Sequence, residues 1–587
     1  MFDYVRFRYR RMVRRFRRDL RLLERWAINY VDRHIWGKWH QFGVVRRFLL
    51  TWFGVLAITV IGVVQQTGGL QRAEQIAVPA LGGTYSEAAV GRVQTLNPVL
   101  PESELSGDIN RLIFSGLTRY NANRTLVADL AERWEVSPDG RVYTFYLRKN
   151  VKWQDGVPFT SADVAFTLTA IQTPDSRSPL ASSWQGVTVE TRGDYTVVFT
   201  LPQPLASFLD STTIGIVPRH LLESIDPSQL REASFNQQPI GTGPFQLKTF
   251  APSAHEIALT ANPHYYGGRP NIADFIFRFY DTPEAAMTAY AQHQVTSPGR
   301  VLPTEASRRG QLVGLSDYDL TLPEETVLFF QTTDDVLKDK DLRGVLSRSL
   351  QRGAIASQAT AGQGVVVSQP LLPGQLGYTP KYGLTSLSPE AAAAALDGLG
   401  WTQSRAGAVR QKAGQPLKLQ LVTLSGGELE LAAKEIRRQW AKLGIQVELK
   451  TVDATDLQQT YMRPRNFQLL LFGINLGADP DVYPFWHSSQ AKDPGVNLSS
   501  YASADADKAL EAARVKTDPV VRAGKYDSFL KAWNADAPAA ILYETAYQYA
   551  VSEDVAGITA SRLVTPADRF YNVEHWTVRR TWADLLP

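Results

Sequence analysis

The sequence contains no cysteine among its 587 residues. This absence excludes disulfide bonds, thiolate zinc sites, iron–sulfur clusters, a cysteine nucleophile and a lipid anchor on cysteine. The 8 histidines form no HExxH motif and no pair spaced by four residues. The sequence also lacks a P-loop, a GxSxG elbow and an SxxK motif with its partner boxes. These absences favour a binding protein over an enzyme.

The composition nevertheless supports folded domains along most of the chain. Hydrophobic residues make up 44% and charged residues 20%, which is typical of a globular protein with a buried core. At roughly 100–200 residues per domain, the length predicts about three to five domains.

Charge is divided unevenly between a short amino-terminal segment and the rest of the chain. Residues 1–47 hold 13 arginines and one lysine against four acids, a net charge of +10. The remaining residues carry 48 basic and 54 acidic side chains, a net charge of −6. The body therefore has no excess of positive charge with which to bind nucleic acid.

An uncharged stretch of 17 residues, FLLTWFGVLAITVIGVV, occupies residues 48–64. As a helix it would be ~26 Å long, slightly less than a hydrocarbon core of ~30 Å. A buried core helix and a cleaved signal peptide are the alternatives. The 47 residues before the stretch are longer than a usual signal-peptide n-region, and no small-x-small cleavage site follows it. We therefore predict an uncleaved transmembrane helix.

The basic segment predicts how this helix is oriented. Fourteen basic residues precede residues 48–64, whereas only Arg72 follows closely, so the amino terminus is expected in the cytoplasm and the body outside it. The arginine-rich residues 1–47 suit a helix lying on anionic lipid, with nucleic-acid binding as the alternative. Residues 65–82 are expected to form a linker.

A β-α-β-α-β pattern runs through the later part of the chain. Strands are predicted at residues 417–424, 445–452 and 467–472, with a helix at residues 428–443 between the first two. Right-handed crossovers then imply a parallel sheet, and ligands bind beyond the carboxyl ends of such strands. This places residues 473–481 (GINLGADPD) at the mouth of a cleft.

Two local motifs have a structural and a functional interpretation. Asp479 and Asp481, with His487, could bind a metal, but such residues on a polar loop are more often turn formers and helix caps. The glycines of residues 241–243 (GTG) precede proline and phenylalanine, so they predict a tight turn and not a dinucleotide site. Most tryptophans are expected in the core, with one or two lining a pocket. The candidates are Trp134, Trp153, Trp184, Trp401, Trp440, Trp486, Trp533 and Trp576.

Several blocks, in the same order, resemble the peptide-type extracytoplasmic solute-binding proteins of ABC importers, a group with dipeptide-, oligopeptide-, nickel- and sugar-binding members. The blocks include TLNP at residues 95–98, residues 128–168, PIGTGPF at residues 239–245, residues 262–280 and QWAKLGI at residues 439–445. The similarity extends over roughly residues 83–573. No single block would suffice, but their common order makes the resemblance specific.

The resemblance implies an α/β fold, a two-lobed periplasmic-binding-protein-like clamp with an extra α+β subdomain, preceded here by one transmembrane helix. The implied boundaries are lobe I at residues 83–120, 238–325 and 546–587, the subdomain at residues 121–237, and lobe II at residues 326–545.

The resemblance also implies candidate ligand-binding residues. In peptide-binding relatives, a strand leading into a Gly-Trp segment pairs with the peptide main chain, and the matching positions are Gly473, Ile474 and Asn475. The glycine matches, whereas the tryptophan does not. Asn97 lies in a loop on the opposing lobe and could face the ligand.

A departure from the family concerns the acid that receives the α-ammonium group of the peptide. By counting from Gly473, its place falls on Leu476 or Gly477, neither of which carries a charge. A buried ammonium without a counter-charge is very unfavourable. Either Asp479 or Asp481 supplies that charge, or the ligand lacks the group.

These inferences predict a monomeric, single-pass protein of the cell membrane. Its extracytoplasmic body would capture a peptide or similar small solute by lobe closure and deliver it to an ABC-type permease, without catalysis, cofactor or metal. The alternatives are a ligand-sensing receptor built on the same clamp, the binding of a non-peptide solute such as a sugar or a metal chelate, and an extracytoplasmic hydrolase.

Overall fold

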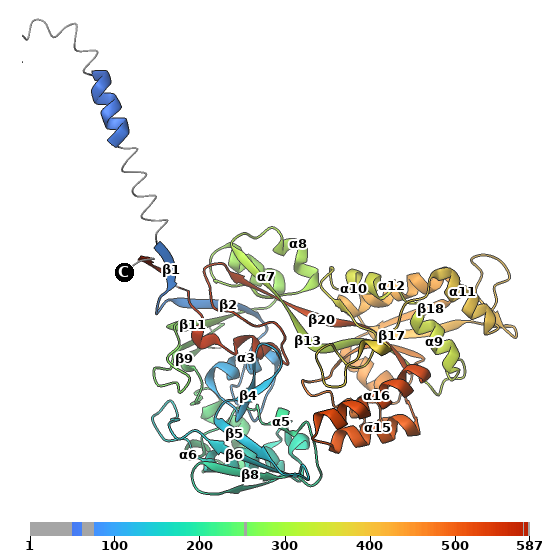
Figure 1. Cartoon of the computed structure of the whole chain (residues 1–587), viewed down its shortest axis with the longest axis horizontal. Coiled ribbons are helices and arrows are strands. Elements are labelled where there is room, and N and C mark those ends of the chain that lie inside the picture. The colour runs from blue at the N-terminus through green and yellow to red at the C-terminus, as the bar shows by residue number, and fades with distance from the viewer. Residues whose placement is uncertain (1–49, 61–74, 252–254, 579, 585–587) are drawn as a thin grey trace, which may run out of the picture. The chain divides into compact units, whose positions relative to one another are not determined.

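The computed structural model of the chain describes residues 50–60, 75–251, 255–578 and 580–584 (Figure 1). The chain divides into two compact units, Met1–Val78 with Arg580–Pro587, and Pro79–Arg579.

The smaller unit contains a helix over residues 50–60 and a two-stranded sheet of β1 (Gln75–Pro79) and β21 (Arg580–Asp584). Strand β1 thus lies within the predicted linker. The large apolar side chains of the helix are all exposed: Leu50, Trp52, Phe53, Val55, Leu56, Ile58 and Val60. The predicted span at residues 48–64 extends beyond the described residues, and the basic segment 1–47 lies outside them. Among the described residues, no helix combines the length and the apolar character needed to cross a membrane.

The larger unit begins with two four-stranded sheets. The first has the order β2 (Thr84–Val90), β11 (Asp274–Tyr280), β10 (Glu256–Ala261) and β9 (Phe245–Ala251), with β2 and β11 parallel. The second is antiparallel, with the order β5 (Ala131–Val136), β6 (Val142–Leu147), β8 (Thr196–Thr200) and β7 (Thr188–Thr191). Both sheets contribute to one hydrophobic core, in which Phe275 and Phe145 are fully buried.

A larger mixed sheet follows along the chain. Its order is β12 (Gly299–Val301), β20 (Ala539–Ser552), β13 (Leu315–Phe330), β19 (Leu469–Asn475), β17 (Lys418–Leu424) and β18 (Gln446–Val452), and β14 (Val365–Val366) pairs with β20. β17 is parallel to both β18 and β19, which confirms the predicted parallel arrangement.

The helix between β17 and β18 packs on the sheet through the apolar face that the sequence predicts. Helix α12 (Gly427–Lys442) buries Ile436 and Trp440 against the sheet, as the 3.6-residue period predicts. Gly444 follows it with φ +75°, a conformation that favours glycine and ends the helix.

The other helices and strands are shorter or lie around these sheets. They are α3 (Glu104–Ile113), β3 (Thr118–Tyr120), β4 (Leu126–Ala128), α4 (Ser161–Gln172), α5 (Phe208–Ser211), α6 (Arg219–Leu222), α7 (Pro283–Ala291), α8 (Ala306–Arg309), α9 (Lys340–Arg348), α10 (Arg352–Ala359), α11 (Pro389–Gly398), β15 (Gln411–Lys412), β16 (Gln415–Pro416), α13 (Ala454–Asp456), α14 (Tyr483–Trp486), α15 (Ala504–Val515) and α16 (Pro519–Asp536). Short 3-10 helices include η3 (Ala181–Trp184) and η11 (Pro566–Phe570), and η9 (Leu457–Met462) is a π-helical turn.

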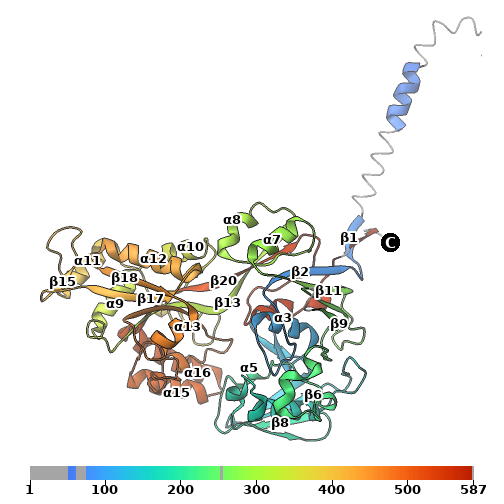
Figure 2. The same cartoon turned by 180° about the vertical axis from the view of Figure 1, so that it is seen from behind.

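Two long antiparallel strands, β13 and β20, join separate hydrophobic cores within the larger unit (Figures 1 and 2). Leu320 and Tyr549 belong to the core shared with the first two sheets, whereas Val327 and Ile541 belong to a second core beneath the mixed sheet. The pairing register shifts between Thr321 and Glu325 and again after Thr326. Because β13 and β20 contribute side chains to both cores, they connect the two lobes of the fold. The residue boundaries of the lobes stay a prediction.

The glycines of the GTG motif have a packing role. A Cβ atom on Gly241 would lie 1.9 Å from the carbonyl oxygen of Ile113, and one on Gly243 would lie 2.6 Å from that of Leu112. Only a residue without a side chain allows the backbone to approach the end of α3 so closely.

Candidate functional site

A cavity of about 600 Å³ in the larger unit is lined by residues far apart in the sequence. One wall is the segment Pro98 to Phe114, which leads into and includes α3. Trp184 on η3 and Asp210 on α5 line another side, residues 564–568 a third, and the loop after β19 contributes Gly477 and Ala478. Apolar and aromatic lining with a few polar groups is typical of small-ligand sites.

The predicted strand edge lies immediately before this loop. β19 pairs with β13 as far as Asn475, but its pairing with β17 involves only Leu469 and Leu470. Gly473 and Asn475 are exposed, and a Cβ atom placed on Gly473 would meet nothing within 4 Å. The Ile474 side chain is buried in the core, so only its backbone can take part in ligand binding. The structure thus brings the end of β19 next to the cavity loop.

Asp479 is engaged in an ion pair. Arg522 on α16 donates to both carboxylate oxygens of Asp479, with Nη1 2.5 Å from Oδ2. Arg522 is 5% exposed, so this pair is largely shielded from water. The predicted reception of a ligand ammonium by Asp479 would require Arg522 to release it.

Asp481 has a similar partner, because Arg514 lies with Nε 3.0 Å from its Oδ2 atom. Burial raises the pKa of Asp481, while Arg514 lowers it. No group of three or more histidine or acidic side chains in the described part of the chain is placed to hold a metal ion.

Asn97 is buried and holds the loop that precedes α3. Its Nδ2 donates to Asn236 Oδ1 at 2.9 Å, and its Oδ1 accepts from the backbone NH of Val99 at 3.1 Å. The next residue, Pro98, lines the cavity, whereas the Asn97 side chain does not. The structure therefore places Asn97 behind the cavity wall.

Several lining residues were not predicted from the sequence. No motif in the sequence distinguishes four of them: Asp210, Tyr120, Asn110 and Arg111. Trp184 also lines the cavity. The sequence predicts that one or two of eight tryptophans line a pocket, but it does not identify which.

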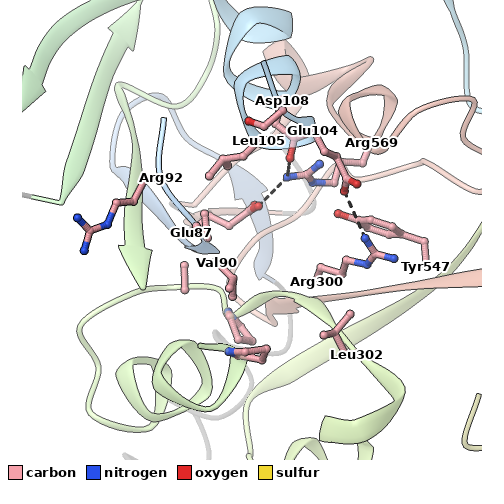
Figure 3. A pocket seen from close by; sticks show the side chains of 16 residues that line it. Glu87, Val90, Arg92, Glu104, Leu105, Asp108, Arg300, Leu302, Tyr547 and Arg569 are labelled. Atoms are coloured by element: carbon pink, nitrogen blue, oxygen red, sulfur yellow. Dashed lines mark hydrogen bonds and ion pairs between the residues drawn. The ribbon is translucent and has the colours of Figure 1, made fainter. Parts of the chain in front are cut away.

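A second cavity, of about 360 Å³, is lined in part by Glu104, Leu105 and Asp108 of α3 (Figure 3). Glu104 lines both cavities and pairs with Arg300 at 3.3 Å. Deeper in, Arg569 is 2% exposed and places Nη2 2.7 Å from Glu87 Oε1 and 2.8 Å from Asp108 Oδ2. These buried charges fix η11 against β2 and α3.

Comparison with known proteins identifies relatives of similar length. The family model for bacterial extracellular solute-binding proteins, family 5, middle, matches residues 125–497. The oligopeptide-binding protein AppA of Bacillus subtilis is 28% identical over 515 residues, which are 85% of this chain and 92% of that protein. Protein XP55 of Streptomyces lividans is 30% identical over 500 residues, 84% of this chain and 87% of that protein.

Solved structures give the same fold. The structure of Bacillus subtilis AppA in complex with a nonapeptide has a TM-score of 0.67 at 26% identity and covers 86% of this chain and 100% of that one. NikZ from Campylobacter jejuni in complex with Ni(L-His) has a TM-score of 0.68 at 25% identity, covering 84% of this chain and 99% of that one. With a family model matching more than half of its residues, the chain belongs to family 5 of the bacterial extracellular solute-binding proteins.

Proposed function

We propose that this protein captures a peptide or similar small solute outside the cytoplasm and delivers it to an ABC-type permease. The observation that carries the proposal is the cavity that takes its lining from the predicted lobes I and II and from the subdomain, with the loop directly after β19 on one side. The relatives support it, since AppA is named an oligopeptide-binding protein. No covalent step and no cofactor are part of this function.

The main-chain groups of Gly473, Ile474 and Asn475 are proposed to pair with an extended ligand as an added strand would. Asp479 and Asn97 support the site by fixing the loop and the segment that line the cavity. Specificity then comes from the cavity walls.

Lobe closure is proposed as the mechanism, because contacts already cross between the predicted subdomain and lobe II. Arg124 Nη2 lies 2.9 Å from Glu544 Oε1, and the Ala206 amide donates to the Arg514 carbonyl at 3.1 Å. A ligand that touches both lobes binds the closed form more tightly than the open one and shifts the population toward it.

A peptide panel tests this function. Peptides of two to ten residues are added to the full chain while its melting temperature is measured; a ligand at 100 times its Kd adds about 2.7 kcal/mol of stability. Nickel–histidine and a set of sugars serve as the non-peptide arm, motivated by the complex of NikZ. A shift with non-peptide solutes alone would replace the peptide assignment, and no shift with any solute would contradict the binding function.

Membrane anchoring is proposed from the apolar helix over residues 50–60, whose side chains are exposed on every face, and from the uncharged residues that flank it. We expect the full chain to remain with membranes after carbonate extraction and a variant lacking residues 48–64 to appear in the soluble fraction. Release of the full chain by carbonate would contradict the anchor.

A receptor function is the second candidate, favoured by the length and charge of residues 1–47. Deletion of residues 1–40 separates the two: altered gene expression with intact uptake supports a receptor, and loss of uptake alone supports an importer component.

A further inference from the structure

Asp210 is an acidic residue on the cavity wall that accepts hydrogen bonds from neutral groups. Its Oδ1 accepts a hydrogen bond from the Tyr120 hydroxyl at 2.5 Å, and its Oδ2 accepts one from the backbone NH of Asp479 at 3.2 Å. In the described part of the chain, neither oxygen has an ion-pair partner. Each carboxylate oxygen therefore keeps an accepting position that these neutral donors leave open.

The other acids around the site are already balanced or capped. Glu104 pairs with Arg300, and Asp479 with Arg522. Asp568 accepts from the backbone NH of Thr565 at 2.8 Å as part of a helix cap. Asp210 is thus the acid in the cavity whose charge is left to a ligand.

The cavity wall adds a further acceptor and an excess of negative charge. Of the described residues, three acidic ones line the cavity, Glu104, Asp210 and Asp568, but only one basic residue, Arg111, does so. Asn110, which is 7% exposed, also lines the cavity, and its Oδ1 atom has no hydrogen-bond partner among the residues that the structure describes. A buried acceptor without a donor is costly unless a ligand supplies the donor.

Space for that ligand exists beside Asp210. Gly477, which also lines the cavity, has no side chain, and a Cβ atom placed on it would lie 4.0 Å from Asp210 Oδ2. Gly477 has a φ of +70°, a backbone conformation that a residue with a side chain would adopt only with strain.

We propose that Asp210, oriented by Tyr120, receives a primary ammonium group of the bound solute, such as the amino terminus of a peptide. The proposal rests on the function proposed above and names the chemical group that the cavity selects. Buried charge-assisted hydrogen bonds are the stronger ones, so this contact would dominate orientation in the cavity.

The pH dependence of binding has a definite sign. Burial raises the pKa of Asp210 to about 6, against the hydrogen bond from Tyr120 and the charge of Arg522, which lower it. The titratable and charged groups that face Asp210 are Tyr120 on β3, Asp479 after β19 and Arg522 on α16. Since the contact needs an ionised carboxylate and a protonated amine, affinity is full between about pH 6 and the pKa of the amine, about 8 for a peptide amino terminus, and falls up to ~10-fold per pH unit below pH 6.

The test uses a peptide library without lysine, arginine or histidine, prepared with free and with acetylated amino termini. Wild-type chain should bind the free library about 10- to 150-fold more tightly than the acetylated one. Asp210→Asn should remove this preference and leave the acetylated library unaffected. Asp175→Asn, an exposed aspartate outside the cavity lining, is the matched control and should behave as wild type.

A second variant keeps the test informative if Asp210→Asn does not fold. Tyr120→Phe removes the hydroxyl that favours the ionised carboxylate, so the pH midpoint of binding should move upward while binding at pH 8 is largely kept. A merely structural role of Tyr120 would not move the midpoint.

Benzylamine and benzyl alcohol separate failure of this inference from failure of the proposed function. If peptides bind equally with and without acetylation, the assignment to Asp210 is overturned and the function stands. If peptides do not bind, but benzylamine binds wild type and not Asp210→Asn, the ammonium site stands and the peptide function falls. If benzyl alcohol and benzylamine also bind equally to both chains, both are overturned.

Discussion

Replacing Arg569 by methionine is expected to lower the free energy of unfolding by about 3–5 kcal/mol at pH 7.5. The guanidinium is 2% exposed and pairs with two carboxylates, Glu87 and Asp108, which are 2% and 5% exposed (Figure 3). Methionine keeps much of the volume but leaves two negative charges facing each other away from water. Urea unfolding of the full chain, followed by tryptophan fluorescence, measures the loss.

The pH dependence of this loss identifies its cause. Burial raises the pKa of Asp108 to about 6 even with Arg569 present, so the ionised form is the costly one. Arg569 lowers the pKa of Asp108, so without Arg569 this pKa lies higher still. The stability deficit of the variant therefore grows as pH rises above about 6 and is smallest below it. The deficit of Arg569→Met should therefore shrink between pH 7.5 and pH 5.

Arg92, an exposed arginine that lines the same 360 Å³ cavity as Arg569, provides the control. Arg92 pairs with Asp281, and both side chains are largely exposed. Arg92→Met should change stability by less than about 1 kcal/mol, as exposed ion pairs generally do. A stability of Arg569→Met equal to wild type at pH 7.5 would contradict the role assigned to the buried charges.

The substitution Ala478→Trp is expected to abolish ligand binding, with a loss of at least about 100-fold in affinity. Ala478 lies on the cavity wall in the loop after β19 and is partly exposed, so an indole there would extend into the cavity. Filling the cavity removes the space for a ligand without disturbing either core. Calorimetric titration with a peptide selected by the panel measures the affinity.

Ala491→Trp controls for the added aromatic group, because Ala491 is a partly exposed residue of the same lobe that does not line the cavity. It should bind as wild type does. Binding to Ala478→Trp at wild-type affinity would place the ligand elsewhere on the molecule.

The parallel part of the mixed sheet could be predicted because its signals are local. Residues that form β17, α12 and β18 follow one another, and each period is readable within about 16 residues. The spacing of Thr160 and Asp163, three residues apart before an apolar run, is also a local signal of a helix start, and the Thr160 amide donates to Asp163 at 2.9 Å.

The charge pairing around the cavity could not be predicted, because it depends on tertiary contacts. Arg522 meets Asp479 from 43 residues away, and Asp210 meets the Asp479 backbone from 269 residues away. The sequence offers Asp479 as a substitute for the acid of the family but cannot show which arginine neutralises it. The long strands β13 and β20 were missed for the same reason, since their pairing joins distant segments.

The most direct test is a crystal structure of the chain with the ligand selected by the peptide panel, together with mass analysis of the ligand recovered from the crystals. We predict one unaltered molecule in the 600 Å³ cavity, with main-chain hydrogen bonds to Gly473–Asn475. A ligand bound outside this cavity, or one recovered in cleaved form, would contradict the account.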